Sequence, residues 1–114
     1  MIGVDPVNVS RARDRFNTDC SWFPDGRWIA SSSEFPAGGT PLVHPNIIAF
    51  FVPGKGGLGD PPAPLRVTFS DEHEDGAPSV SPDGLVVAFE SHRTGDEDSP
   101  SDLWVIAVPP ALEP

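Results

Sequence analysis

Cysteine, lysine and tyrosine are scarce or absent in this sequence of 114 residues. The single cysteine, Cys20, excludes an internal disulfide, so oxidising and reducing compartments are both compatible with the chain. Cys20 stands just before an expected strand, and we expect a half-buried structural thiol there rather than a nucleophile. The scarcity of lysine and the absence of tyrosine fit a biased genomic base composition or an adaptation to salt, and the sequence does not separate the two.

Positive charge is also scarce. Seven lysine and arginine residues stand against seventeen aspartate and glutamate residues, which gives a formal net charge of −10 and a pI near 4.4. Phosphate backbones and anionic membrane surfaces repel such a chain, so we expect no nucleic-acid partner. The short basic run from Arg11 to Arg15 is interrupted by Asp14 and is interpreted as a solvated loop.

Long hydrophobic runs are absent. The longest apolar runs have six residues, and the first residues lack a basic segment followed by an apolar one. We therefore expect neither a membrane-spanning segment nor a signal peptide in this chain. Fifteen prolines and eleven glycines leave no room for a long helix. The prediction is an all-β fold in one domain over residues 1–114.

One phrase occurs twice in the sequence. Residues 20–33, CSWFPDGRWIASSS, return in outline as residues 78–91, PSVSPDGLVVAFES. Pro24 and Pro82 are 58 residues apart (82 − 24 = 58). A repeat of this kind is typical of architectures in which copies of one unit stack and bury a shared core.

Both copies contain the tripeptide Pro-Asp-Gly, at Pro24, Asp25 and Gly26 and again at Pro82, Asp83 and Gly84. Proline suits the second position of a type I turn, aspartate suits the third, and glycine accepts the left-handed conformation that follows. The β-branched and aromatic residues on either side of each turn favour strands. These six residues are therefore predicted to close two β-hairpins and to have a structural role.

The repeat extends beyond the turns. Residues 7–10 align with residues 65–68, and the apolar run 47–52 corresponds to the run 103–108 at an offset of 56 (108 − 52 = 56). Each copy then supplies an outer strand, the two strands of a hairpin and a buried central strand. We divide the chain into a first repeat, 7–52, a proline- and glycine-rich loop, 53–64, and a second repeat, 65–108.

The second copy resembles the repeat of TolB-type β-propellers, which are relatives of the WD-repeat propellers. The residues that carry the resemblance are Ser81–Gly84, Val86–Phe89, Ser91, Arg93, Gly95 and Asp102–Val105. The resemblance covers about residues 7–108 and implies a partial β-propeller of about two four-stranded antiparallel blades joined by Pro-Asp-Gly hairpins. It also implies a structural role for Asp102, which would begin a central strand and pair with Arg93 or hold loop backbone. The first copy departs from the pattern at Phe23, at Ser31 and in residues 34–41.

Two blades are too few to close a ring, because propellers have about four to eight. Either the chain is a piece of a longer product, or copies associate and cover the apolar faces that each blade exposes. The first outer strand has no preceding partner, and no strand follows Val108. A head-to-tail ring of about three subunits and six blades is one hypothesis.

Possible metal, nucleotide and catalytic sites all lack a matching pattern. Acidic residues at 72–75 and 95–102 and the three histidines fit no metal motif, and solvated acidic loops are preferred over calcium at 95–102. The glycines at 54–59 are not followed by the lysine and hydroxyl residue of a phosphate loop. No Gly-X-Ser-X-Gly sequence occurs. We expect no catalytic, metal or cofactor-binding residue, and no enzyme activity.

Two functions stay open. The resemblance implies a non-catalytic interaction module whose partner is a protein, a peptide or further blades of the same propeller, and it implies a periplasmic or exported location. The alternative is a part of the gating propeller of a serine peptidase similar to the prolyl oligopeptidase or tricorn groups. Fold alone does not separate these functions, and the chain itself leaves the location unknown.

Overall fold

The structure is a computed structural model that describes residues 6, 8–10, 17–37, 42, 44–53, 62–70, 72–92 and 101–112. Over these residues the chain forms seven β-strands and no α-helix, so the all-β prediction is confirmed. The physical reason is the high proline content, because proline has no backbone N–H and clashes with the preceding helical turn. Most of the predicted loop 53–64 lies outside the described residues.

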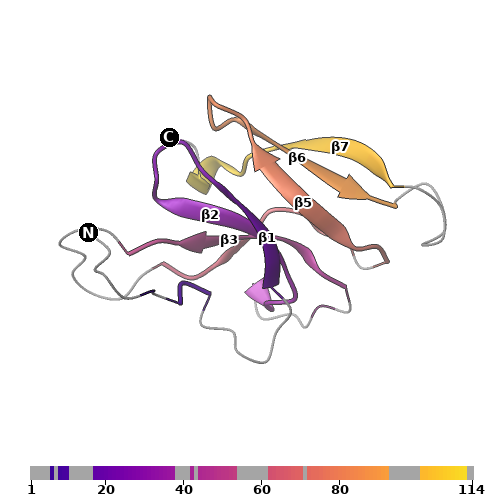
Figure 1. The fold of residues 1–114 in the computed structure, drawn as a ribbon, viewed down its shortest axis with the longest axis horizontal. Helices are drawn as coiled ribbons and strands as arrows, with labels where there is room; N and C mark the ends of the chain where they lie inside the picture. The colour runs from indigo at the N-terminus through magenta and orange to yellow at the C-terminus, as the bar shows by residue number, and fades with distance from the viewer. Residues whose placement is uncertain are drawn as a thin grey trace.

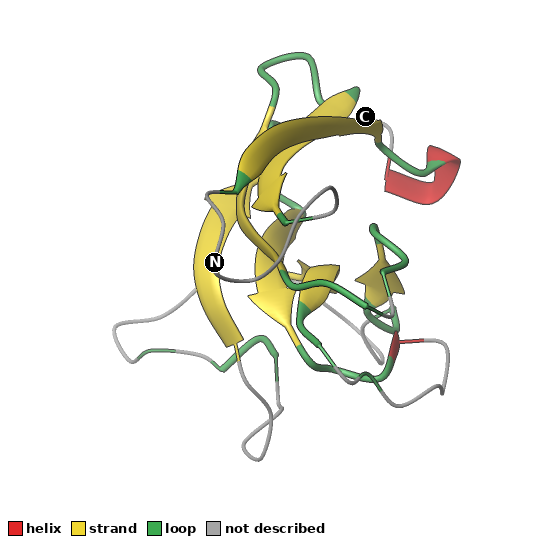
Figure 2. Cartoon of the chain, turned by 90° about the vertical axis from the view of Figure 1, so that its right-hand side faces the viewer, coloured by secondary structure: helices red, strands yellow, loops and turns green. Residues whose placement is uncertain are grey.

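The strands are β1 (Asn17–Trp22), β2 (Trp28–Ser33), β3 (Asn46–Phe51), β4 (Leu65–Arg66), β5 (Asp75–Val80), β6 (Val86–Ser91) and β7 (Asp102–Ala107). They form two antiparallel sheets, the first in the order β1-β2-β3-β4 and the second in the order β5-β6-β7 (Figure 1). We expected four strands in each unit, and the second sheet has three among the described residues. Within these residues the two sheets do not close into a ring (Figure 2).

The connection between β1 and β2 is a tight turn over residues 23–27. The Gly26 N–H donates a hydrogen bond to the Phe23 carbonyl at 2.9 Å, and Gly26 has a φ of 72°. The Asp25 carboxylate accepts a hydrogen bond from the Arg27 N–H at 2.9 Å. The aspartate thus satisfies a backbone donor that the sharp turn leaves without a strand partner.

The connection between β5 and β6 has the same geometry. The Gly84 N–H donates to the Ser81 carbonyl at 2.9 Å, Gly84 has a φ of 75°, and the Asp83 carboxylate accepts from the Leu85 N–H at 3.0 Å. The Ser81 hydroxyl adds a bond to Asp83 Oδ1 at 2.6 Å. The first turn has Phe23 at this position, whose side chain is buried in the core instead.

Both sheets also contain an irregularity at corresponding points. The β1–β2 register shifts between Thr18 and Cys20, and the β5–β6 register shifts between Gly76 and Ser79. Asp19 and Ala77, which are 58 residues apart, have φ values of 48° and 46° in these bulges. A left-handed conformation at a non-glycine residue is uncommon, so its occurrence at both positions indicates that the two strand pairs follow the same path.

The two-residue strand β4 pairs with β3 and belongs to the first sheet. The repeat alignment places these residues at the start of the second copy, so the sheets and the sequence copies have different boundaries. The chain completes the first sheet with β4 and then enters the second sheet at β5. The segment after β4 therefore runs from one edge of the first sheet to the β5 edge of the second sheet, which lies beside β1.

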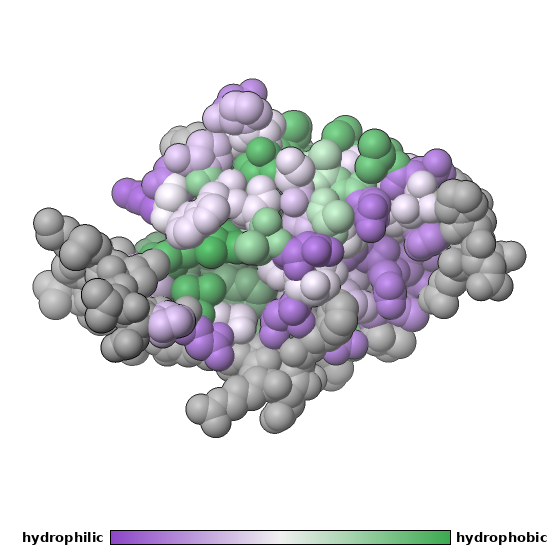
Figure 3. Space-filling view, in the orientation of Figure 1, coloured by the Kyte–Doolittle hydropathy of each residue, from purple (hydrophilic) through white to green (hydrophobic). Residues whose placement is uncertain are grey.

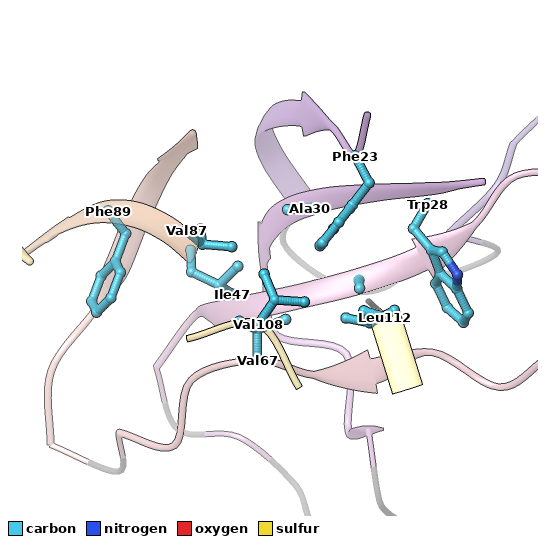
Figure 4. Close-up of a cluster of buried hydrophobic side chains, with 10 residues drawn as sticks. Phe23, Trp28, Ala30, Ile47, Val67, Val87, Phe89, Val108 and Leu112 are labelled. Carbon is cyan, nitrogen blue, oxygen red and sulfur yellow. The ribbon is translucent and has the colours of Figure 1, made fainter. Parts of the chain in front are cut away.

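The main hydrophobic core lies between the two sheets (Figure 4). Its buried residues are Phe23, Trp28, Ala30, Ile47, Ala49, Val67, Val87, Phe89, Val108 and Leu112. Val108 and Leu112 come from the C-terminal segment, where Pro110–Leu112 forms a 3-10 helix. Burial of each large side chain contributes about 1.5–3 kcal/mol, which makes this core the main source of stability that the two sheets share.

A second, smaller core covers the opposite side of the first sheet. Ile48 and Phe50 of β3 are buried there, with the partly buried residues Val9, Phe35 and Leu42 packed against them. The rings of Phe35 and Phe50 meet edge to face with their centroids 5.7 Å apart. The first sheet is therefore packed on both faces, by the second sheet on one side and by its own connecting segments on the other.

Candidate functional site

The side of β3 that faces the second sheet has a clear counterpart on β7. Ile47 and Ala49 correspond to Leu103 and Val105 at the offset of 56. The β6–β7 register places Val86 opposite Ala107 and Ala88 opposite Val105, so these residues lie on one face of the second sheet. Leu103 lies on the same face, opposite exposed Glu90. We name the "open face" as Val86, Ala88, Leu103, Val105 and Ala107, which Glu90 borders.

Exposure separates the two faces. Ile47 and Ala49 are 0% exposed, whereas Leu103 is 84% and Val105 is 73% exposed. Figure 3 shows the resulting hydrophobic surface along β7. We expected the run 103–108 to form a buried central strand, and this is corrected: β7 lies at the edge of its sheet. Among the described residues no third sheet packs on the open face, so its apolar side chains stay in contact with solvent.

The edge of β3 shows what β7 lacks. The Val67 N–H donates to the Ile47 carbonyl at 2.8 Å, and the Thr68 hydroxyl oxygen accepts from the Ile47 N–H at 2.9 Å. Fully buried Asn46 accepts from the Ser70 N–H at 2.6 Å and donates to the Ser70 carbonyl at 2.9 Å. Residues 65–70 therefore cover the outer edge of β3.

No strand among the described residues pairs with the outer edge of β7. Leu103 takes the place of Ile47 in the alignment, so its N–H and carbonyl correspond to the groups that bind Val67 and Thr68 in the first sheet. An unpaired edge of this kind is a ready template for another extended segment. The open face and this edge together form the candidate interaction surface.

The predicted turn residues lie at the two turns and are not part of the candidate interaction surface. Pro24, Asp25 and Gly26, and also Pro82 and Asp83, are exposed at the turns, and Gly84 is buried. The hydrogen bond from the Ser81 hydroxyl, followed by the one from the Leu85 N–H, holds the pKa of Asp83 below its usual range. Each aspartate accepts hydrogen bonds within its own turn.

Arg93 and the loop 93–100 lie outside the described residues, so the pairing expected between Arg93 and Asp102 stays a prediction. Asp102 is the first residue of β7 and is exposed. Cys20 is exposed in β1, which corrects the expectation of a half-buried thiol. The cause is its place on an edge strand, where the chain bulges at Asp19.

A polar hollow of about 230 Å³ lies where β1, β2, β5 and β6 meet, with Asp19, Glu74, Asp75 and Glu90 among its lining residues. Within the described part of the chain, no three histidine, cysteine, aspartate or glutamate side chains are grouped so that they could hold a metal ion. The same described residues contain no helix with the length and hydropathy of a membrane span.

Sequence reasoning missed the Asn46 network and the exposure of β7. The sequence signal for these features was the alignment of Ile47 with Leu103. This alignment shows that the two strands are similar, but it does not show which of them is covered by another segment. No protein-family model matches this chain, and no curated protein matches it closely enough to count as a relative. The assignment of a function therefore depends on the geometry of the two sheets.

Proposed function

We propose that this chain is a non-catalytic segment of a TolB-like β-propeller and that it acts as a protein–protein interaction module within a larger propeller or an oligomer. The observation that carries the proposal is the open face. Ile47 and Ala49 of the first sheet are buried between the sheets, whereas their counterparts Leu103 and Val105 in the second sheet are exposed. Exposed apolar patches on a sheet that also has an unpaired edge are typical of interaction sites.

Corresponding features of the two sheets support an arrangement of repeated units. Strands β1 and β5, and likewise β2 and β6, begin and end 58 residues apart, and so do the two bulges. The sheets stack face to face and share one core. A unit that buries only one of its faces by stacking needs a further neighbour on the other face.

The experiment that tests this proposal adds a third unit. A second copy of residues 62–112 is joined after Pro114, and unfolding in urea is followed by circular dichroism. We expect the added unit to fold on the open face, so that the urea dependence of the unfolding free energy rises with the additional buried surface. The matched control carries Val105→Lys in the middle sheet, where a charge opposes docking.

An added unit that stays unfolded, or one that is insensitive to Val105→Lys, would contradict the repeat arrangement. Hydrolysis of a fluorogenic peptide by the purified chain would contradict the non-catalytic part of the proposal. That second measurement also addresses the peptidase alternative, for which the described residues supply no supporting geometry.

A further inference from the structure

The two sheets pack against each other through faces that do not correspond in the sequence alignment. Val87, Phe89, Trp104 and Ile106 of the second sheet pack toward the first sheet. Their counterparts in the first sheet are Ile29, Ser31, Ile48 and Phe50, which the β2–β3 register places together on the face that points away from the second sheet. We name these four residues the "outer face". The junction thus joins unlike faces and not two identical ones.

Ser31, Ile48 and Phe50 of the outer face are buried, and Val9, Phe35 and Leu42 pack against Ile48 and Phe50. The part of this face that a partner can reach is a cavity at Ile29. A cavity of about 350 Å³ is lined by Val9, Cys20, Ile29, Ser31 and Phe50, together with neighbouring polar residues of the N-terminal segment and β1. Ile29 and Val9 are partly exposed in it. Phe50 forms a buried base. The cavity is of a size and polarity that suit a protruding aliphatic side chain.

The open face supplies such side chains at the other end of the molecule. Leu103 and Val105 project from β7 with 84% and 73% of their surface exposed. Figure 1 places the trace of residues 8–10 at the lower left and β7 at the upper right. The two surfaces lie on opposite sides of the molecule and cannot meet within one copy.

The N-terminal segment provides a second match. Val9 aligns with Val67, which follows β4, donates a hydrogen bond to the Ile47 carbonyl at the β3 edge and is buried in the main core. Val9 is partly buried against Ile48 and Phe50 of the outer face, and Val67 is buried in the core between the sheets. A neighbouring β7 edge on this side would therefore meet the segment 8–10 as the β3 edge meets residues 65–68.

From these complementary surfaces we propose that a second copy of this chain docks head to tail, with the open face of one copy on the outer face of the next. Leu103 and Val105 enter the cavity beside Val9 and Ile29, and the free edge of β7 receives the N-terminal segment. This inference rests on the proposed function. Contacts between unlike faces close into rings or extend into filaments, depending on the rotation between copies.

The experiment measures the mass of the full chain by light scattering and sedimentation between about 1 µM and about 1 mM, the range of weak specific contacts. Leu103→Lys places a charge in the open face, and Ile29→Lys places a charge in the outer face. We expect the unaltered chain to exceed its monomer mass of 12.1 kDa as concentration rises, while each variant alone stays monomeric. An equimolar mixture of the two variants forms pairs that grow no further, because each variant keeps one intact surface.

Leu85→Lys is the matched control, since Leu85 is 48% exposed and lies outside both surfaces. It should associate like the unaltered chain. Val9→Lys is a second outer-face variant in case Ile29→Lys fails to fold by circular dichroism. Association of Ile29→Lys or Val9→Lys with itself would show contact between identical open faces and overturn the head-to-tail arrangement.

A chain that stays monomeric throughout the concentration range would also overturn it. The chain extended by a third unit separates this outcome from failure of the proposed function. If the added unit folds on the open face while the original chain stays monomeric, the proposed function stands and the inference about a second copy is wrong.

Discussion

Strands β3 and β7 have nearly the same pattern and opposite surroundings. Ile47 and Ala49 of β3 are sealed between the sheets and β4. Leu103 and Val105 of β7 occupy the corresponding positions and face solvent. The comparison shows that two similar apolar runs can be buried in one sheet and exposed in the other, because burial depends on the neighbour that each strand acquires.

The largest expected difference between the strands comes from truncating the matched pair. Ile47→Ala should lower the free energy of unfolding by about 2–5 kcal/mol, because it leaves a cavity in a closed core. Leu103→Ala should change it by less than about 0.5 kcal/mol, because the side chain is already exposed. Urea denaturation of both variants at a concentration where the chain is monomeric measures the contrast. Equal losses would show that β7 is buried in solution.

The second-largest expected difference in stability concerns substitutions at the edges of these two strands. Asn46→Ala should cost about 2–3 kcal/mol, since the Ser70 N–H and carbonyl lose their buried partner. Its counterpart Asp102 is exposed, and Asp102→Ala should cost less than about 1 kcal/mol. Thermal unfolding followed by circular dichroism compares them. A small effect at Asn46 would indicate that residues 65–70 do not hold the edge of β3.

The two turns should respond alike to loss of glycine. Gly26→Ala should destabilise the chain by about 1 kcal/mol, because alanine is strained at positive φ while its Cβ meets no atom within 4 Å. Gly84→Ala should have a similar effect through the same strain. In the bulge, Ala77→Gly should relieve strain and stabilise by less than about 1 kcal/mol. Urea unfolding tests all three, and a stabilising Gly26→Ala would contradict the left-handed turn.

The smallest effect concerns the charge of the second turn. The Ser81 hydroxyl and the Leu85 N–H favour the ionised form of Asp83, so its pKa in the folded chain is depressed. The stabilisation is present above the pKa of the unfolded chain and is lost as pH falls through the lower folded value. Ser81→Ala should raise the pKa of Asp83 toward its usual range. Carboxyl titration by NMR measures it, and an unchanged pKa would rule out the serine as the cause.

Local structure was largely predictable because it depends on neighbours in sequence. Proline, aspartate and glycine select the turn through φ preferences and a side-chain hydrogen bond. The β-branched and aromatic residues around Gly26 and Gly84 favour extended backbone on each side. The absence of an α-helix from the described residues follows from the high proline content. These expectations needed no knowledge of distant contacts.

The partners of the strands were harder to predict. Residues 65–66 align with the start of the second copy but pair with Ile48 and Ala49 of the first sheet. The residues that follow them bind Ile47 and Asn46 at the same edge. The exposure of Cys20 was also missed, because it depends on the position of β1 at a sheet edge. Such features arise from contacts between residues far apart in sequence, which periodicity does not specify.

The sequence by itself determined an acidic all-β chain with two similar turns, because composition and local backbone preferences act without regard to the fold. Only the tertiary structure decided that β4 pairs at the edge of the first sheet and that, within the described ranges, no strand covers the outer edge of β7 or its exposed face. The physical reason is that the free energy of burying Ile47 or Leu103 depends on a second surface. A strand cannot provide this second surface itself, so another part of the molecule must pack against it.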